Sequence, residues 1–329
     1  MKIAVVILNW NGQKLLEQFL PSVIAHSLEA KIYVADNASS DDSVSFIISN
    51  YPNITIVQNT ENGGYAKGYN DALKQIEADV FCLLNSDVEV SENWLSPIID
   101  TFNSEPKTAI IQPKILDYKD RTHFEYAGAA GGFIDTYAYP FCRGRIFNTI
   151  EKDKGQFNDT TGIFWASGAC LFIRKPVFQA LNGFDESFFA HMEEIDLCWR
   201  AYNLEYTTKY VGASQVFHVG GATLKNTNPK KTYLNFRNSL FTLTKNAGGN
   251  IFTLVFTRLL LDGIAGVKFI LEFKLNHVLA IIEAHFSFYV HLSQLLKQRK
   301  ALPQKKNYAK ETSIVWSYFV NNKRHYKSL

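Results

Sequence analysis

The chain is poor in cysteine: its 329 residues contain four, at Cys82, Cys142, Cys170 and Cys198. They form no C-x-x-C pair, which argues against a structural zinc site and against a compact disulfide framework. Such scattered thiols fit a reducing compartment. The N-terminal apolar run Ile3–Leu8 is followed at once by polar residues, so it is too short for a signal peptide. We therefore expect a cytoplasmic protein.

Two common phosphate-binding patterns are also missing. The glycine-rich stretch Asn59–Asn70 (NTENGGYAKGYN) is not G-x-G-x-x-G, and no G-K-[ST] follows it as in a P-loop. Dinucleotide and NTPase functions are therefore weakly supported. Glycines nevertheless let the backbone approach a ligand closely, and a helix N-terminus attracts phosphate. The stretch is thus either an ordinary turn or a ligand-binding loop, and its place between two expected strands favours the loop.

Apolar residues are plentiful, and charge is unevenly distributed. With 47% hydrophobic and 14% aromatic residues, the chain can bury a substantial core in one large or two modest domains. Residues 297–329 hold nine Lys or Arg and one acid, Glu311, which leaves 25 bases against 30 acids in residues 1–296. The basic excess therefore belongs to the C-terminus. We expect no nucleic-acid partner.

Apolar, β-branched runs alternate with segments of helical periodicity in the first third of the chain. The runs are Ile3–Leu8, Ile32–Ala35, Ile54–Val57 and Val80–Leu84. Such alternation predicts an α/β fold with a mostly parallel central sheet flanked by helices. Further strands are expected at Ala109–Ile115, Ile163–Ile173, Thr207–Val211 and Gln215–Val219.

Polar side chains follow the expected strand that ends at Leu84. Asn85 and Asp87 are oxygen donors two residues apart, and at the end of a buried strand both can reach a hard cation such as Mg²⁺ or Mn²⁺. The carboxyl ends of strands are also where an open α/β sheet binds its ligand. Asn-Ser-Asp equally forms a simple turn. Both interpretations remain open on this stretch alone.

A second acidic group lies at the start of an expected helix. Glu193, Glu194 and Asp196 bring three carboxylates there, and the helix dipole accounts for one or two of them. Downstream, His218 precedes Gly220-Gly221 at the end of a strand. A lone histidine is usually a packed or surface residue, unless an acidic site nearby needs a ligand.

Two regions leave their role undecided. Residues 117–162 carry scattered aromatics without periodicity, as in a lid or acceptor surface, or in a satellite hydrophobic cluster. The chain then reads as helical from Tyr233 to Lys300. Ile251–Leu271 is apolar but interrupted by Arg258, Asp262 and Lys268, so we reject a spanning helix. A hairpin at a membrane interface and a soluble helical subdomain are both compatible with the pattern.

Eight segments in order resemble the family 2 glycosyltransferases, especially their rhamnosyltransferase-like branch. They are VVILNWN (Val5–Asn11), VADNASSDDS (Val34–Ser43), NGGYAKGYN (Asn62–Asn70), LLNSDV (Leu83–Val88), WASGACLFIRK (Trp165–Lys175), GFDESFFAHMEEIDLCWR (Gly183–Arg200), FHVGG (Phe217–Gly221) and FRNSL (Phe236–Leu240). The resemblance implies a GT-A type nucleotide-diphospho-sugar transferase domain over residues 1–246. Residues 247–329 form a helical extension with a basic tail.

The resemblance also implies residue roles. Nucleotide-sugar contacts fall on Asn9, Asp36, Asn62, Gly63, Gly64, Lys67, Asn85 and Ser86. The implied ligands of a divalent cation, Mg²⁺ or Mn²⁺, are Asp87 and His218, with Asn85 assisting. The implied catalytic base is Glu194. Because the family more often has Asp at this position, Glu193 and Asp196 are alternatives. Acceptor contacts fall on Trp165, Ser167, Gly168 and Ala169.

The implied reaction is inverting, metal-dependent sugar transfer from a nucleotide-diphospho-sugar to a glycan or lipid-linked acceptor. An inverting enzyme needs a single base on the face opposite the leaving group. Such a protein works in the cytoplasm, and the inner face of the plasma membrane is a candidate surface for it to bind. The rival from another class is a non-catalytic scaffold of the same fold in glycan assembly, favoured only by Glu194 and Asn85 in place of aspartates.

Overall fold

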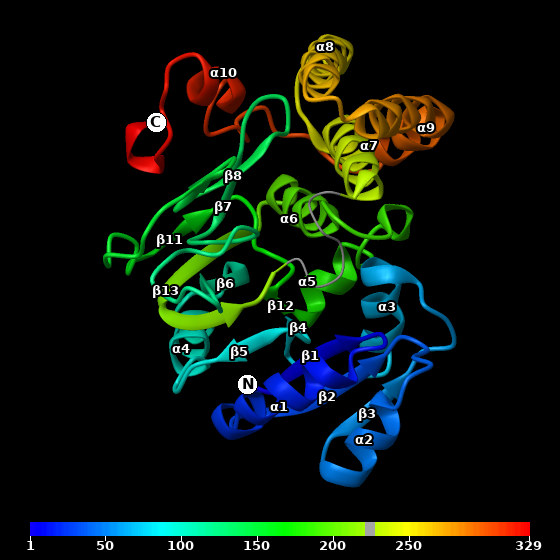
Figure 1. Cartoon of the computed structure of the whole chain (residues 1–329). Helices are drawn as coiled ribbons and strands as arrows, with labels where there is room; N and C mark the ends of the chain where they lie inside the picture. Colours follow the sequence, from blue (N-terminus) through cyan, green and yellow to red (C-terminus); the bar gives the residue numbers. More distant parts are fainter. Residues whose placement is uncertain (221–227) are drawn as a thin grey trace.

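The computed structural model describes residues 1–220 and 228–329, and a mixed sheet forms its centre (Figure 1). Gly221 of the FHVGG segment lies outside the described residues. The sheet strands are β1 (Ile3–Asn9), β2 (Ala30–Asp36), β3 (Thr55–Gln58), β4 (Val80–Asn85), β5 (Val88–Val90), β6 (Thr108–Asp117), β11 (Thr160–Ile163), β12 (Cys170–Arg174) and β13 (Thr207–His218). Their order is β11-β13-β6-β12-β4-β1-β2-β3, and β5 pairs with β13.

Strand direction brings several polar strand ends to one edge. β3, β2, β1 and β4 are mutually parallel, β12 is antiparallel to both β4 and β6, and β13 is parallel to β6. Two reversals restore the original direction, so β6 and β13 end at the same edge as β1, β2 and β4. The expected mostly parallel α/β sheet is confirmed.

Helices cover both faces of this sheet, which explains the near-continuous apolar runs of its central strands. The helices are α1 (Gln13–His26), α2 (Ser43–Asn50), α3 (Gly64–Leu73), α4 (Ser96–Ser104), α5 (Lys175–Ala180), α6 (Glu193–Asn203), α7 (Pro229–Asn246), α8 (Ile251–Leu271), α9 (Leu275–Lys300) and α10 (Ile314–Phe319), with 3₁₀ turns at Glu186–Phe188 and Tyr326–Ser328. Alternate residues of β1 enter different cores: Val5 packs in the cluster containing Leu16, and Val6 in the cluster containing Tyr69.

Two expected strand assignments differ from the structure. The two expected strands at Thr207–Val211 and Gln215–Val219 are one strand, β13, whose register against β6 shifts between Val211 and Gln215. An irregularity there breaks the alternation without ending the strand. Conversely, the expected Ile163–Ile173 strand is split into β11 and β12, because the residues between them leave the ladder.

Residues 117–162, which we call the aromatic excursion, contain a small antiparallel sheet and take part in a separate hydrophobic cluster. The sheet comprises β7 (Gly132–Ile134), β8 (Pro140–Cys142), β9 (Arg145–Ile146) and β10 (Thr149–Ile150). Phe141 and Ile146 pack there against Ile314 and Tyr318 of α10. The structure therefore matches the satellite-cluster interpretation, with the C-terminal segment supplying half of the cluster.

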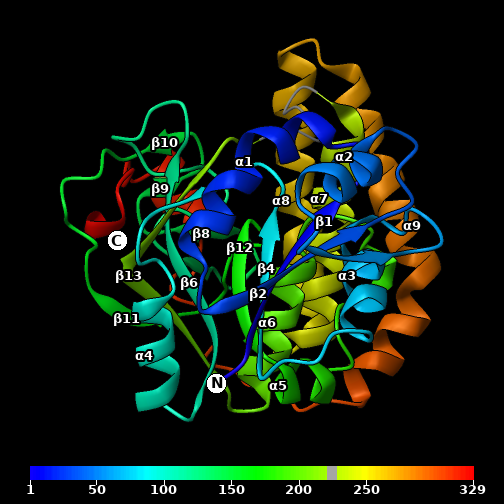
Figure 2. The same cartoon turned by 90° about the horizontal axis from the view of Figure 1, so that it is seen from below.

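The C-terminal helices stack on the α6 side of the sheet (Figures 1 and 2). α7 and α9 lie side by side, and α8 packs against both. Phe288 and Leu295 of α9 join the same core as Trp199 of α6. Figure 2 shows the connected ends of α8 and α9 projecting beyond the rest of the molecule.

Candidate functional site

Asn9 and Asp36 are adjacent at the sheet edge because β1 and β2 are parallel and in register there. Both are fully buried. Asn9 Nδ2 donates to Asp36 Oδ1 at 3.0 Å, while Asp36 Oδ2 accepts from Ser39 N at 2.9 Å and Gln58 Nε2 at 2.6 Å. The Asn9 side-chain oxygen, in contrast, is buried without a partner. A buried acceptor without a partner can accept a hydrogen bond from a ligand.

Asn85, Asp87 and His218 meet at the same edge, although 133 residues separate Asn85 from His218. His218 Nε2 is 3.1 Å from Asp87 Oδ1 and 3.4 Å from Asn85 Nδ2. The pairing of β13 with β5, which sets His218 opposite Val88, brings the two segments together. Asp87 and His218 are each 5% exposed.

Glu125, which the sequence did not single out, completes this cluster. Its Oε1 is 3.4 Å from His218 Nδ1, and its Oε2 accepts from Ala127 N at 2.6 Å. Burial lowers the pKa of His218, but attraction to Glu125 and the hydrogen bond with Asp87 outweigh it and raise the pKa to about 10. Glu125 lies in the aperiodic excursion, where no spacing pattern marked it.

The donor set at this edge fits a divalent cation. A carboxylate and an imidazole, here those of Asp87 and His218, are ligands that Mn²⁺ or Mg²⁺ accepts. His218 directs Nε2 toward Asp87 and Asn85, while its buried Nδ1 faces Glu125 without a hydrogen bond of normal geometry. Among the described residues, no group of three or more His, Cys, Asp or Glu side chains is arranged so that it could hold a metal ion by itself. Ligands from the substrate would complete the shell.

The glycine-rich stretch forms the loop before α3 and contacts the segment that leads to α6. Gly64 has φ +72°, and a Cβ there would lie 2.5 Å from Phe189 O, so only glycine fits. Asn62 Oδ1 accepts from Gly64 N at 3.1 Å and from Asn37 Nδ2 at 3.0 Å. Gly63 is the N-cap residue of α3. This loop therefore joins two expected site segments.

Lys67 and Ser86 lie near this edge and face neighbouring groups of the protein. The Lys67 ammonium pairs with Asp71 on the next turn of α3 and lies 3.5 Å from Glu61. Ser86 is partly exposed and follows Asn85 at the end of β4. Its hydroxyl lies 3.9 Å from where a Cβ on Gly12 would be, so Ser86 faces the turn that follows β1.

Glu193 and Glu194 begin α6, and no ion pair joins either of them to a cation among the described residues. Glu193 is 5% exposed, and one buried carboxylate oxygen of each has no hydrogen-bond partner. Burial and the charge of Glu194 raise the pKa of Glu193 well above its usual value. Burial likewise raises the pKa of Glu194 to about 7, although backbone N–H groups at the helix start oppose the shift. Two such coupled carboxyls readily share a proton near neutrality.

The segment that precedes Glu193 and Glu194 has a strained backbone. Phe189, His191 and Met192 have φ values of 62°, 69° and 73°, a region that non-glycine residues rarely adopt. The side chain of Asn238 on α7 donates to Phe188 O, Ala190 O and His191 O at 3.1, 2.9 and 2.7 Å. Asn238 therefore acts as a clamp on the segment preceding Glu193.

Arg237 supports the same clamp. Its Nη2 donates to Ser187 O at 2.9 Å and to Phe188 O at 3.1 Å, and its Nε donates to Asn238 Oδ1 at 2.8 Å. The FRNSL segment thus holds the backbone in front of α6. Sequence reasoning identified the segment but not the carbonyl groups that it binds.

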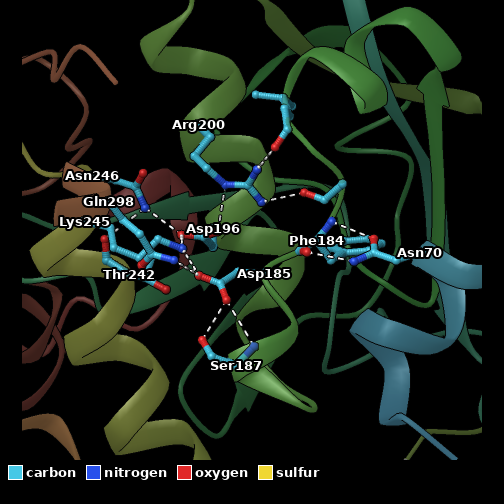
Figure 3. A network of polar contacts seen from close by, with 12 residues as sticks. Asn70, Phe184, Asp185, Ser187, Asp196, Arg200, Thr242, Lys245, Asn246 and Gln298 are labelled. Carbon is cyan, nitrogen blue, oxygen red and sulfur yellow. Dashed lines mark hydrogen bonds and ion pairs between the residues drawn. The ribbon is translucent and has the colours of Figure 1, made fainter. Parts of the chain in front are cut away.

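Asp196, one turn further along α6, belongs to a different environment (Figure 3). Its carboxylate accepts from Arg200 Nε at 2.8 Å and Asn246 Nδ2 at 2.8 Å, and it lies 2.9 Å from Lys245 Nζ. Lys245 also pairs with Asp185 at 2.6 Å. We call Asp185, Asp196, Arg200, Lys245 and Asn246 the α6 anchor. The structure therefore separates Asp196 from the unpaired glutamates, because its oxygens already have partners.

Most of the expected acceptor residues lie inside the protein. Trp165, Ser167 and Ala169 are 2%, 1% and 4% exposed. Trp165 Nε1 donates to Phe133 O at 2.9 Å, and Ser167 N donates to Gln112 Oε1 at 2.8 Å. Gly168 is partly exposed, and its carbonyl accepts from Tyr65 Oη at 2.9 Å. This segment shapes the wall behind the site, so its side chains are not placed on an open acceptor surface.

Comparison with known proteins identifies the fold and the family pattern. The model of "Glycosyl transferase family 2" matches residues 4–181, just over half of the chain. N-acetylglucosaminyl-diphospho-decaprenol L-rhamnosyltransferase of Mycobacterium tuberculosis is 24% identical over 66% of this chain and 75% of its own length. Rhamnosyltransferase WbbL of Escherichia coli is 22% identical over 66% and 83%, respectively.

Solved structures show the same GT-A-like architecture. The S. aureus TarS structure with UDP-GlcNAc has a TM-score of 0.55 at 16% identity and covers 99% of this chain and 93% of that one. GalNAc-T7 with UDP, GalNAc and Mn²⁺ has a TM-score of 0.58 at 15% identity, covering 75% of this chain and 48% of that one. At this identity the likeness shows the fold alone.

Proposed function

This chain belongs to glycosyl transferase family 2 as a rhamnosyltransferase-like member, and on that premise we propose an inverting, divalent-cation-dependent transferase. It moves a hexosyl or deoxyhexosyl group from a nucleotide-diphospho-sugar to a glycan or lipid-linked acceptor in cell-surface polysaccharide synthesis. The observation that carries the proposal is the meeting of Asp87 and His218, 3.1 Å apart, at the edge where β1, β2 and β4 also end.

Asp87 and His218 would hold Mg²⁺ or Mn²⁺, with Asn85 beside them. The ion would supply neutralisation of the departing diphosphate. Glu125 faces the far side of the His218 ring and orients it, as a carboxylate partner does for a metal-bound histidine. Solved GT-A-like structures of GalNAc-T7 and of the mannosyltransferase PcManGT contain Mn²⁺, which supports this choice of ion.

The nucleotide would lie along the edge from Asp36 to the Asn62-Gly63-Gly64 loop. Asp36 orders Asn9, Ser39 and Gln58 through its hydrogen bonds, and the unpaired Asn9 oxygen lies against the turn at Gly12. The Asn62-Gly63-Gly64 loop would contact the nucleotide through its outer surface, because the N–H groups of Gly64 and Tyr65 already donate to Asn62 Oδ1 and Phe189 O. Lys67 and Ser86 complete the proposed donor contacts at the rim.

Glu194 is the proposed base. Its pKa near 7 suits a group that must accept a proton from an acceptor hydroxyl at neutral pH. Glu193 is the alternative, and the two are coupled. We propose Asp196 as a structural anchor and not as a base, because its lone pairs are engaged by Arg200, Lys245 and Asn246.

Acceptor contacts are proposed for exposed aromatic rings beside the buried Trp165–Ala169 wall. Phe189 is 39% exposed and lies four residues before Glu193, while Tyr126 is 40% exposed and follows Glu125. Flat sugar faces stack on such rings. Gly168, the partly exposed member of the wall, remains in the proposed surface. The reaction is placed at the cytoplasmic membrane face, where a lipid-linked acceptor would be available.

A scaffold without activity is the second candidate, and the unpaired glutamates count against it. Burying two carboxyls without a cation costs stability, and perturbed pKa values of this kind cluster at functional sites. The test is a thermal-shift panel of UDP-, dTDP- and GDP-sugars with and without Mn²⁺. A native-state ligand raises the melting temperature. We expect a Mn²⁺-dependent rise with one nucleotide class and its loss in Asp87→Ala; no response to any sugar nucleotide would contradict transferase activity.

A further inference from the structure

The hairpin formed by α8 and α9 carries an apolar face that the described residues leave uncovered. On α8, Phe256, Leu260 and Ile264 recur every four residues and are 63%, 55% and 65% exposed. Phe273 at the tip is 92% exposed, and Phe286 on α9 is 72% exposed. We call these five side chains the hairpin face. A contiguous face of this kind marks an interaction surface.

Two of the three charges that interrupt α8 in the sequence, Arg258 and Asp262, lie on its buried side. Arg258 and Asp262 are 2% and 0% exposed and pair at 2.7 Å. Arg258 Nη1 donates to Tyr137 O at 2.9 Å, and Tyr139 Oη donates to Asp262 Oδ1 at 3.0 Å. Both charges therefore fasten α8 to the aromatic excursion. The outward face of α8 keeps its apolar character from Phe256 to Ile264.

α9 is held along the protein body, so it does not cross a bilayer alone. It is long and apolar enough by composition, with mean hydropathy 1.2 over an 18-residue window. Yet Phe288 and Leu295 pack in the main core, and Gln298 Nε2 donates to Asp185 at 3.1 Å in the α6 anchor. A helix with one side packed against the protein can lie in the membrane surface with its other side toward the lipid.

Cations border the hairpin face where α10 approaches it. Lys268 Nζ of α8 lies 5.5 Å from the centre of the Phe319 ring. Trp316 and Phe319 of α10 are 60% and 57% exposed, so the apolar surface continues across this contact. Arg324 lies 5.4 Å from the centre of the neighbouring Tyr318 ring. The basic excess of the C-terminus is therefore adjacent to exposed aromatic side chains.

We propose that the hairpin face and the adjoining α10 surface dock on a bilayer that contains anionic lipid. Apolar side chains would enter the headgroup boundary while Lys268 and Arg324 meet lipid phosphates. A second copy of the chain is the alternative occupant, and the oligomeric state measured below distinguishes it from lipid. The inference rests on the proposed function in one respect: a lipid-linked acceptor would be presented at this surface.

The test is sedimentation of the full chain with vesicles of phosphatidylcholine, with or without phosphatidylglycerol. We expect binding to the anionic vesicles and weakening by salt. Phe256→Ser/Ile264→Ser should reduce binding at least ~10-fold, because each apolar side chain contributes about 1.5–3 kcal/mol on burial. Ile48→Ser is the matched control: Ile48 on α2 is 61% exposed and lies outside this surface, so binding should be unchanged.

Three results would overturn the docking surface: no binding of the wild-type chain, equal binding by the double variant, or a wild-type dimer that the double variant converts to a monomer. The last would assign the face to a second copy. Mn²⁺-dependent thermal shift with sugar nucleotides, measured on the same samples, separates this proposal from the previous one. Vesicle binding without any thermal shift by sugar nucleotides would contradict the proposed transferase function and would still support the docking surface.

Discussion

Two carboxylate environments lie within one turn of α6 and differ in their counter-charges. Asp196 contacts Arg200 and Lys245, while in residues 1–220 and 228–329 no ion pair involves Glu193 or Glu194, and each keeps one buried oxygen without a hydrogen-bond partner. Asp185 illustrates the first environment: burial raises its pKa, but the nearby Lys245 outweighs this and lowers it. Burial raises the pKa of both glutamates.

This difference separates a structural charge from a reactive one. A fully paired carboxylate stays ionised and fixes backbone elements, here the 3₁₀ turn before α6 together with α7 and α9 (Figure 3). A carboxylate buried without a cation keeps a proton affinity near neutrality and can exchange protons. The anchor therefore holds α6 in place while the glutamates at its N-terminus remain available for chemistry.

The largest expected effect is on Glu194. Glu194→Gln removes the proton acceptor and keeps the volume, so turnover should fall by roughly 10²–10⁴-fold while sugar-nucleotide binding persists. Turnover is measured by release of the nucleoside diphosphate in the presence of acceptor, and binding by thermal shift. Glu205→Gln is the control, because Glu205 follows α6 with 82% of its side chain exposed. Undiminished turnover in Glu194→Gln would move the base to Glu193.

Removing the paired carboxylate should instead affect stability. Asp196→Ala leaves Arg200 and Lys245 buried with one partner fewer, and breaking a buried ion pair in this way costs about 3–5 kcal/mol of unfolding free energy. Urea unfolding gives the value. Glu77→Ala is the control, since the Lys175–Glu77 pair has Glu77 91% exposed and its loss should not be measurable. A variant as stable as wild type would mean that the anchor is not needed for folding.

The sequence predicted the elements of both environments but not their pairing. The apolar runs identified β1, β2 and β4, and the acid-rich segment identified the start of α6. Asp196 and Glu194 are two residues apart, and both are acidic residues of the same acid-rich segment. Their difference depends on Lys245 and Asn246, which approach only because α7 packs on α6. Glu125 was missed for the same reason: its partner His218 is brought to it by the β6–β13 pairing, which no local pattern encodes.

The two environments should respond to pH in opposite directions. The pKa of Glu194 is raised from 4.5 to about 7 in the folded chain, so its contribution to stability is complete below pH ~4.5 and is lost as pH rises through about 7. The lowered pKa of Asp185 gives a contribution that is present above its unfolded value and lost on acidification. Glu194→Gln should thus be more stable than wild type at pH 8, by at most about 3 kcal/mol.

Unfolding curves of Glu194→Gln and Asp185→Asn from about pH 2 to about pH 8 measure these contributions. The advantage of Glu194→Gln over wild type should shrink as the pH falls from about 8 toward about 4.5. The deficit of Asp185→Asn should stay nearly constant above about pH 4 and shrink only below it, because the lowered pKa of Asp185 lies under its unfolded value of 3.8. Parallel curves for the two variants would show that the environments do not differ in charge compensation. Turnover of the wild type should rise with pH through about 7, because the base acts in its ionised form.

The smallest expected effect is on the clamp that places the glutamates. Asn238→Ala frees the carbonyl groups of Phe188, Ala190 and His191, so the strained segment should relax and misplace Glu194. We expect kcat to fall about tenfold, since small displacements of a catalytic group are costly, with KM for the sugar nucleotide unchanged. Asn235→Ala, one turn earlier on α7, is the control. A purely structural role would lower the melting temperature and leave kcat per folded molecule intact, and only a fall in kcat at full folding supports positioning.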